Sequence, residues 1–463
     1  MDKNDTELLE KIRQQFNSGP YPRTDLEQSP QEQPDLIYIH NLVTSFYLRN
    51  QKIIETRDKL ILDIGCGTGY KSLALAQANP GAVIFSIDIS EPSIEIAKKR
   101  LQYHGVDNVE FHVLSLQNLQ KLNTKFDYIN CDEMLYLFPE PAIGLQAMKS
   151  VLKPEGIIRA NLHSLRQREW YYRAQELFKF MGLMDDNPQE QEIEIVRETM
   201  KALKDGVGLK VNTWNSKRED DEQWYLMNYL FQGDRGFTIP ELFSALRASE
   251  LEFISMVNWR QWNLMDLFKT PDDLPVFLGL ALPETSTEER LHLFELLHPV
   301  HRLLDFWCGH PNQAHPFVPV AEWTVSDWQK VNIDLHPQLR TPDAKAELLR
   351  SIAQLQPFEI SKYLPIAGQS SLVDSTIAAC LTPLWESAQE MPSLMARWQQ
   401  LRPVNPLTLE PTSPEEAFEV IRQALTGLED LGYVLLERQS GSESSPPLNK
   451  DGGEDSNVAN KIF

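Results

Sequence analysis

The stretch from Lys59 to Ser90, KLILDIGCGTGYKSLALAQANPGAVIFSIDIS, decides the fold. Its apolar runs predict buried strands over 60–64 and 83–87, and the Leu- and Ala-rich segment between them predicts a helix. Alternating glycines form the turn after the first strand, and Asp88 ends the second. Ligands of open α/β sheets bind beyond the carboxyl ends of the strands, so we expect this turn and Asp88 to share one pocket. A carboxylate there suits the diol of a ribose.

The glycine spacing excludes two common nucleotide-binding motifs. A G-x-G-x-x-G motif counted from Gly65 would need its third glycine at Tyr70, and counted from Gly67 at Ser72. The G-x-x-x-x-G-K-[ST] phosphate loop fails because Gly65 and Gly69 are one residue too close. The pattern that remains is D-x-G-x-G-x-G.

The segments LILDIGCGTG and SIDIS resemble the first and second motifs of the class I S-adenosylmethionine-dependent methyltransferases. The resemblance implies that S-adenosylmethionine is the cofactor. Where that family usually has an acid after the third strand, bonding the adenine amino group, this chain has Leu-Ser-Leu-Gln, so Ser115 or a backbone group would take its place. The cofactor-binding residues that we predict are Asp63, Gly65, Cys66, Gly67, Gly69, Asp88, Ile89, Ser115 and Leu116.

The pattern of alternating elements continues beyond Asp88 and predicts a mostly parallel sheet with an antiparallel last strand. FDYI and LKPEG open its fourth and fifth strands, as they do in the methyltransferase family that the chain resembles. We therefore expect an α/β, Rossmann-like methyltransferase fold with a helical insertion and a mainly helical C-terminal domain. The sheet is expected to end with a helix over 239–249 and a strand over 251–257, whereas 288–306 has the pattern of an amphipathic helix.

These patterns divide the chain into four parts. They are an N-terminal helical cap (1–55) with helices expected over 7–16 and 36–50, the methyltransferase domain (56–262) with its helical insertion (165–236), a mainly helical C-terminal region (263–438) and a disordered tail (439–463). From about residue 265 we expect no strand before a closing one at 432–436. The part from 341 to 438 weakly resembles predicted regulatory domains of winged-helix type that some of these methyltransferases carry.

Two segments are candidates for covering the site. Prolines hold the PYPR segment extended, and it resembles a segment that lies over the cofactor pocket in some bacterial methyltransferases, so Tyr21 and Arg23 are candidate substrate-binding residues. A rigid surface linker is the alternative. The insertion is expected to act as a lid over the acceptor, with Trp170 and Tyr172 as candidate contacts, or else as an oligomer-forming arm.

Methyl transfer is an in-line displacement, so the protein mainly aligns the reactants and excludes water. If the acceptor must lose a proton, a base is expected beyond the fourth or fifth strand, where Glu133, Tyr136 and His163 are the candidates. Each has a structural alternative: Glu133 as a helix cap, Tyr136 as a pocket wall and His163 as a strand-end residue.

Composition limits the partners. A formal charge of −22 disfavours nucleic acid and anionic membranes, and neither a signal sequence nor a long apolar run is present. Four widely spaced cysteines form no disulfide framework, so we expect a cytoplasmic protein. The His/Cys run His298, His301, Cys308, His310 and His315 matches no established metal spacing, and we predict no metal.

Three functions stay open at this stage. The first is methyl transfer to an O or N atom of a small metabolite, which the helical insertion favours by enclosing the acceptor. The second is methylation of a protein side chain, and the third is a non-catalytic cofactor-binding or regulatory partner. A closed pocket would favour the metabolite, and an open groove the protein substrate.

Overall fold

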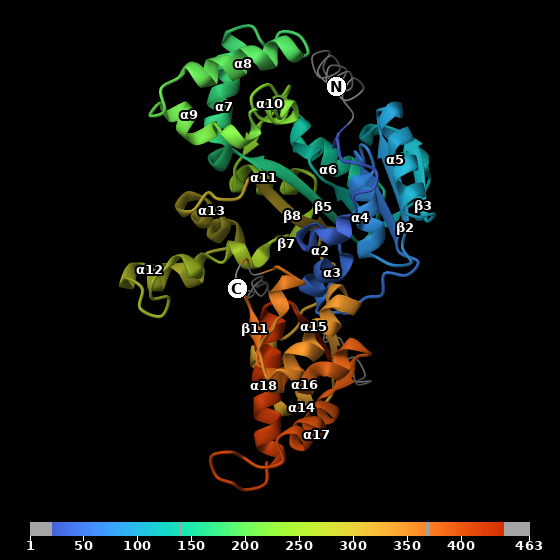
Figure 1. Ribbon diagram of the computed structural model, residues 1–463, viewed down its shortest axis with the longest axis vertical. Coiled ribbons are helices and arrows are strands. Elements are labelled where there is room, and N and C mark those ends of the chain that lie inside the picture. Colours follow the sequence, from blue (N-terminus) through green and yellow to red (C-terminus); the bar gives the residue numbers. More distant parts are fainter. Residues whose placement is uncertain (1–20, 139, 367, 369, 439–463) are drawn as a thin grey trace, which may run out of the picture.

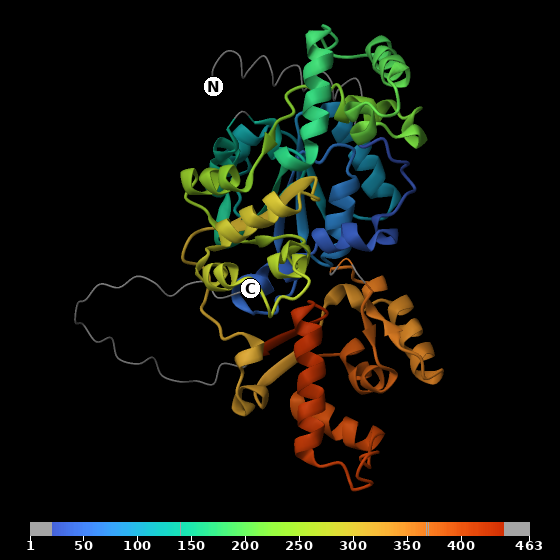
Figure 2. The same ribbon diagram turned by 90° about the vertical axis from the view of Figure 1, so that its left-hand side faces the viewer.

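The computed structural model describes residues 21–138, 140–366, 368 and 370–438 (Figure 1). The predicted N-terminal helix over 7–16 and the predicted disordered tail lie outside these residues. A twisted central sheet forms the upper part of the molecule, and the C-terminal region lies at its lower end (Figures 1 and 2). Within the described ranges, no helix is both long and apolar enough to span a bilayer.

The central sheet has the order β3-β2-β1-β4-β5-β8-β7. All neighbouring pairs from β3 to β5 are parallel, whereas β8 runs antiparallel to both β5 and β7. The predicted Rossmann-like fold is therefore confirmed. The strands are β1 (Leu60–Ile64), β2 (Val83–Asp88), β3 (Val109–Val113), β4 (Phe126–Cys131), β5 (Leu152–Ser164), β7 (Glu252–Met256) and β8 (Leu303–Gly309), and β6 (Gly236–Phe237) pairs with the end of β5.

Strand β8 corrects two expectations from the sequence. The predicted helix over 288–306 ends early, because α13 covers Thr287–Leu297 and Pro299 follows it. The segment after Pro299 returns into the sheet between β5 and β7, where its side chains are mostly buried. The sheet therefore extends past residue 262, and the expectation of no strand beyond 265 is wrong.

Helices cover both faces of the sheet (Figure 1). Ser90 caps the helix after β2 through its hydroxyl, and Thr238 and Glu241 form a capping box on the helix before β7. The predicted helix over 36–50 is divided at His40 and Asn41 into two. These helices are α2 (Pro34–Ile39), α3 (Leu42–Asn50), α4 (Tyr70–Ala78), α5 (Glu91–Tyr103), α6 (Pro141–Ser150) and α11 (Ile239–Ala248).

The insertion after β5 is a helical subdomain with its own small core. Phe178, Val196 and Tyr229 are buried in it, and the rings of Trp224 and Tyr229 meet edge to face. Its last helix and the segment after it return the chain to the end of β5. Its helices are α7 (Leu165–Phe180), α8 (Glu190–Ala202), α9 (Gly208–Thr213) and α10 (Glu222–Asn228).

The C-terminal region packs helices against a three-stranded antiparallel sheet of order β12-β9-β13. It has a core of its own, which reaches the N-terminal segment at Tyr38. Its helices are α14 (Val325–Trp328), α15 (Pro342–Ala353), α16 (Ser375–Leu381), α17 (Met391–Leu401) and α18 (Pro414–Asp430). Its strands are β9 (Val331–Leu335), β12 (Gln389–Glu390) and β13 (Val434–Arg438), with a separate pair β10 (Phe358–Glu359) and β11 (Leu372–Val373), and the short helix α12 (Val276–Ala281) precedes α13.

Candidate functional site

The glycine turn between β1 and α4 lies at the carboxyl edge of the sheet, as predicted. Gly65, Gly67 and Gly69 all have positive φ, between 52° and 82°, which side-chain-bearing residues rarely adopt. The Gly67 N–H donates to Asp88 Oδ2 at 2.9 Å, and Asp88 Oδ1 accepts from Ser90 N at 2.8 Å. Burial raises the pKa of Asp88, although these N–H donors oppose the shift. The turn and the acid thus form one unit.

Two small hollows of about 60 and 50 Å³ adjoin this unit. Both are bordered by Gly65, Asp88 and Ile89, and the Met134 side chain lies between them. A Cβ at Gly65 would come within 2.4 Å of Met134 Cγ, so the methionine lies directly on the glycine turn. Cys66 and Gly67 border the first hollow and Ser115 and Leu116 the second.

Two predicted cofactor residues border neither hollow. Asp63 is buried, accepting hydrogen bonds from Ser72 Oγ at 2.7 Å and Asn130 Nδ2 at 2.9 Å, so it ties α4 and β4 to β1. Gly69 allows α5 to approach closely, because a Cβ there would lie 2.7 Å from that of Ala97. Their contacts support the turn from behind.

The N-terminal segment lies over the glycine turn. Thr68 donates from its backbone N–H to the Tyr21 carbonyl at 3.0 Å and from its hydroxyl to the Pro22 carbonyl at 2.7 Å. The buried Arg100 guanidinium extends this attachment by donating to the carbonyls of Thr24 and Asp25. Tyr21 and Pro22 consequently border the first hollow.

The other predicted substrate contacts lie elsewhere. Arg23 faces outward and pairs with Glu222 at 3.7 Å, with about half of each side chain exposed. Trp170 and Tyr172 border neither hollow: the Trp170 ring packs near Gly208, and Tyr172 packs near Gly236. The insertion reaches the first hollow through Met227 and Phe231 instead.

Glu133 stands just after β4 with a left-handed backbone, φ 58°, which is uncommon for a glutamate. Its carboxylate pairs with Lys71 Nζ at 3.2 Å and with the Arg302 guanidinium. Burial alone would raise the pKa of Glu133, but the two cations outweigh it and lower the pKa to about 2. Glu133 is therefore a permanent carboxylate at neutral pH.

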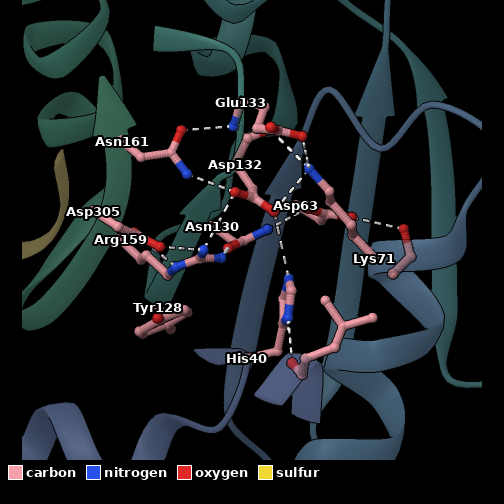
Figure 3. A network of polar contacts seen from close by, with 12 residues as sticks. His40, Asp63, Lys71, Tyr128, Asn130, Asp132, Glu133, Arg159, Asn161 and Asp305 are labelled. Carbon is pink, nitrogen blue, oxygen red and sulfur yellow. Dashed lines mark hydrogen bonds and ion pairs between the residues drawn. The ribbon is translucent and has the colours of Figure 1, made fainter. Parts of the chain in front are cut away.

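Behind Glu133, a buried polar network joins β4, β5 and β8 (Figure 3). Asp132 accepts from Lys71 at 2.7 Å, Asn161 at 2.6 Å and Arg159 at 3.2 Å, and Arg159 also pairs with Asp305 at 2.6 Å. Burial would raise the pKa of Asp132, but Arg159 and Lys71 reverse this and hold it well below its usual value. The network fixes the position of the Lys71 ammonium.

His163 and Tyr136, the other two candidate bases, stack with ring centroids 3.7 Å apart. Asp234 lies 2.6 Å from His163 Nδ1, and Arg302 donates to His163 Nε2 at 3.1 Å, so the imidazole is neutral with its proton on Nδ1. Burial lowers the pKa of His163, although Asp234 opposes the shift. Tyr136 borders the hollow, whereas His163 lies behind it. Arg168 pairs with the other oxygen of Asp234 at 2.9 Å.

The three candidate bases thus come together, with partners that the sequence interpretation did not include. Lys71 directly follows the glycine turn, and its position two residues after Gly69 is a local signal for a role in the site. Arg302 and Asp234 carry no such signal. They reach the site only because β8 lies beside β5 and because the insertion returns at the end of β5.

The histidines and cysteine of the 298–315 run do not meet. His301 stacks on Trp262 with centroids 4.4 Å apart, Cys308 is buried within β8, and the His315 backbone N–H donates to Asn50. In the described part of the chain, no group of three or more His, Cys, Asp or Glu side chains is arranged to hold a metal ion.

Comparisons with known proteins relate the sheet to one class of domain. Residues 55–229 match the family model described as "Methyltransferase domain". Over 277 residues the chain is 28% identical to an uncharacterized protein of Synechococcus sp., covering 58% of this chain and 63% of that protein. The ubiquinone biosynthesis O-methyltransferase of Haemophilus ducreyi is 36% identical over 108 residues, 22% of this chain and 43% of the enzyme. The alignments thus span less than two thirds of either relative.

One solved structure resembles most of the chain. PKMT2 from Rickettsia typhi superposes with a TM-score of 0.57 at 16% identity, covering 90% of this chain and 76% of its own. The same protein in complex with AdoHcy gives a TM-score of 0.56 at 17% identity, covering 90% and 77% of the two chains. At this identity the similarity concerns the fold, and it includes the C-terminal region.

Proposed function

We propose that the chain, whose residues 55–229 match a methyltransferase domain model, transfers the methyl group of S-adenosylmethionine to an oxygen or nitrogen atom of a small molecule. The observation that carries the proposal is the junction of the glycine turn, Asp88 and an enclosed hollow at the carboxyl edge of the sheet. The Haemophilus ducreyi relative is named as a methyltransferase, and PKMT2 from Rickettsia typhi was crystallised with AdoHcy. Both support the choice of cofactor.

The residues at the turn fit this cofactor. A Cβ at Gly65 would clash with Met134 and one at Gly67 with the Tyr21 carbonyl, so only glycine fits at this end of the pocket, and Asp88 offers a carboxylate for a ribose diol. We assign cofactor binding to Gly65, Cys66, Gly67, Asp88 and Ile89. Met134 occupies the position between the two hollows, and its unbranched side chain can change rotamer to widen the pocket. When bound, S-adenosylmethionine supplies a methyl group on a positively charged sulfur.

Four side chains enclose the acceptor space and favour a small acceptor. Tyr21 and Pro22 cover it from the N-terminal segment, and Met227 and Phe231 from the insertion. Such a wall excludes water and restricts the orientation of the acceptor, which is most of what an in-line displacement requires. A broad polypeptide segment would have to displace both walls.

Two residues near the hollow, Glu133 and His163, have different proposed roles. We propose that Glu133, held as a carboxylate by Lys71 and Arg302, provides a fixed negative charge beside the reacting groups. With a pKa of about 2 it is a poor proton acceptor at neutral pH. His163 is neutral and has a lone pair on Nε2, so it is the better candidate to receive a proton from the acceptor once Arg302 and the stacked Tyr136 ring move aside.

The experiment that tests the proposal follows the methyl group. The protein is incubated with S-adenosylmethionine carrying a tritiated methyl group and with a cell extract, and the counts are then divided by ultrafiltration into small molecules and protein. We expect the small-molecule fraction to gain counts. Asp88→Ala should strongly reduce the transfer at limiting cofactor, whereas Glu110→Ala, which changes an exposed acid of the neighbouring strand β3, should not.

The other two functions are distinct outcomes of this assay. Counts confined to the protein fraction would replace the small acceptor by a protein side chain. Cofactor binding by calorimetry without transfer to either fraction would indicate a non-catalytic partner protein.

A further inference from the structure

A cavity much larger than the two hollows lies beyond the edge strand β7. It has a volume of about 510 Å³ and is bordered by residues from β7, the turns after it, α12 and the start of α13. Among the described residues, its lining shares no member with either hollow at the glycine turn. It is therefore a separate site.

The lining of this cavity is mainly apolar and partly aromatic. Trp259, Trp262, Met265, Leu282 and Leu291 contribute to its wall. Native interiors are close-packed and hold few voids larger than a water molecule, whereas pockets for small ligands measure about 300–1,000 Å³. A cavity of this size with this lining has the character of a ligand site.

The helix α12 contributes Gly279 to the cavity lining, and most of its side chains are poorly packed. None of its six residues is buried, and Val276, Phe277 and Leu280 are 72–79% exposed. Figure 1 shows α12 projecting from the body of the protein beside α13. A Cβ at Gly279 would meet nothing within 4 Å, so the helix presents an open backbone surface to the cavity. An apolar ligand in the cavity would lie against the backbone of α12 at Gly279.

The polar residues that line the cavity do not favour a ligand of either charge. Asp272 and Arg290 carry opposite charges, and Asn263 and Thr287 are neutral. Arg290 already donates to Thr285 Oγ1 and to the Leu282 carbonyl, and Asn263 donates to Asp266. The cavity is therefore not arranged to bind an ionised group.

We propose that this cavity binds an uncharged, mainly apolar small molecule, at a site distinct from that of methyl transfer. The ligand contacts Trp259 and Trp262 on one side and the backbone of α12 around Gly279 on the other. Because Trp262 stacks on His301, the residue before Arg302, the cavity wall is also connected to the group that bonds Glu133 and His163.

The test uses the full chain and the uncharged fluorescent probe N-phenyl-1-naphthylamine. We expect one equivalent of probe to bind per chain and 1-dodecanol to displace it. Gly279→Leu fills the cavity from α12 and should weaken probe binding at least tenfold. Gly427→Leu is the matched control, because Gly427 is also a helical glycine whose Cβ would meet nothing within 4 Å, but it lies in α18. It should leave probe affinity unchanged.

A second variant tests the same cavity in case Gly279→Leu does not fold. Met265→Trp enlarges a different lining side chain and should weaken probe binding in the same way. Affinity for S-adenosylhomocysteine, measured by calorimetry, should be the same in all folded variants, so failure here is distinguishable from failure of the proposed enzyme activity. Equal probe affinity in wild type and both filled variants would overturn the proposal. An equal loss in Gly427→Leu would do so too, as would a dimer in ultracentrifugation that Gly279→Leu dissociates.

Discussion

Residue 67 must be glycine, because a side chain larger than a hydrogen atom does not fit between the turn and the N-terminal segment. A Cβ at Gly67 would lie 2.1 Å from the Tyr21 carbonyl oxygen, and the residue has a φ of 52°. The N-terminal segment can rest on the turn only while residue 67 is glycine. The geometry of the pocket floor and of its cover therefore depends on the same position.

We expect Gly67→Ala to weaken S-adenosylhomocysteine binding at least tenfold, or about 1.4 kcal/mol, as measured by calorimetry. Gly105→Ala is the control, since Gly105 has a similar φ of 66° but open space around it. A comparable loss of affinity in both variants would mean that backbone strain, and not the Tyr21 contact, is responsible.

The carboxylate of Asp88 has two roles: it accepts a hydrogen bond from the Gly67 N–H of the glycine turn, and it borders the pocket. Asp88→Ala should reduce cofactor affinity by on the order of 2 kcal/mol, through loss of charge-assisted hydrogen bonds. Calorimetry with S-adenosylhomocysteine measures this directly. Unchanged affinity, with Glu110→Ala as reference, would remove Asp88 from the cofactor site.

Single residues were predictable from the sequence where local geometry defines them. Gly65, Gly67 and Asp88 belong to one strand-turn-helix-strand unit, so their spacing alone brings them together. Trp170 and Tyr172 are candidates because they are aromatic and lie in the insertion, but neither property says which face of a helix is turned to the pocket. Met227 and Phe231 hold that place instead.

At the scale of elements, the insertion returns a carboxylate to the site. Asp234 follows α10 and bonds His163 at the end of β5, while Arg168 and Gln175 of α7 hold its other oxygen. Burial would raise the pKa of Asp234, but the bond from His163 and the charge of Arg168 lower it to about 2. The insertion thus carries part of the proposed catalytic apparatus.

Asp234→Asn should lower kcat by about tenfold or more if His163 acts as the base. Loss of the carboxylate removes an interaction that favours protonated His163, so the acid limb of the pH–kcat profile should shift to lower pH. Glu198→Gln, an exposed acid on α8 of the same insertion, is the control. A fall in kcat with an unmoved acid limb would assign Asp234 a purely structural role.

The strand β8 is the element that sequence patterns missed, for a physical reason. From α13 to β8 the apolar residues are spaced as in an amphipathic helix, and only Pro299 interrupts this spacing. A strand paired on both sides gains its stability from distant partners, β5 and β7, which a local pattern does not contain.

A chain ending at residue 262 should therefore fail to fold, because β5 and β7 would lose the strand between them. Circular dichroism and thermal unfolding provide the measurement, with a chain ending at residue 438 as control, since it keeps every described contact. A cooperative unfolding transition in the shorter chain would show that β8 is dispensable.

At the scale of the whole molecule, two cores meet along the N-terminal helices. Leu304, Phe306 and Cys308 belong to the core of the large sheet, whereas Val320 and many residues after it belong to the C-terminal core. We propose that the division between the two domains lies between these segments and not at residue 262. The joint combines apolar packing with polar contacts: Val43 and Tyr47 pack with Leu435, Thr44 bonds His336, and the Tyr47 hydroxyl donates to Glu429 Oε1 at 2.8 Å.

This joint should respond to pH through Glu429. Burial raises its pKa to about 7, although the bond from Tyr47 opposes the shift, and the ordinary value is 4.5. The folded state therefore binds more protons than the unfolded state between pH 4.5 and 7, and the contribution of Glu429 to stability falls as pH rises through that range. Glu429→Gln should reduce the difference in Tm between pH 5 and pH 8.

The control for this prediction is Glu415→Gln, an exposed residue of the same helix α18. It should preserve the wild-type difference between the two pH values. An identical pH dependence in wild type and Glu429→Gln would show that the carboxyl group does not report on the joint.

The place of β8 in the sheet also has a consequence during synthesis on the ribosome. Roughly 140 residues separate the end of β5 from the start of β8, and their translation takes on the order of ten seconds. Throughout that interval the nascent chain exposes the open hydrogen-bonding edge of β5, which other polypeptides can pair with. Chaperone demand should therefore peak while this stretch emerges, and slower codons within it would lengthen the vulnerable period.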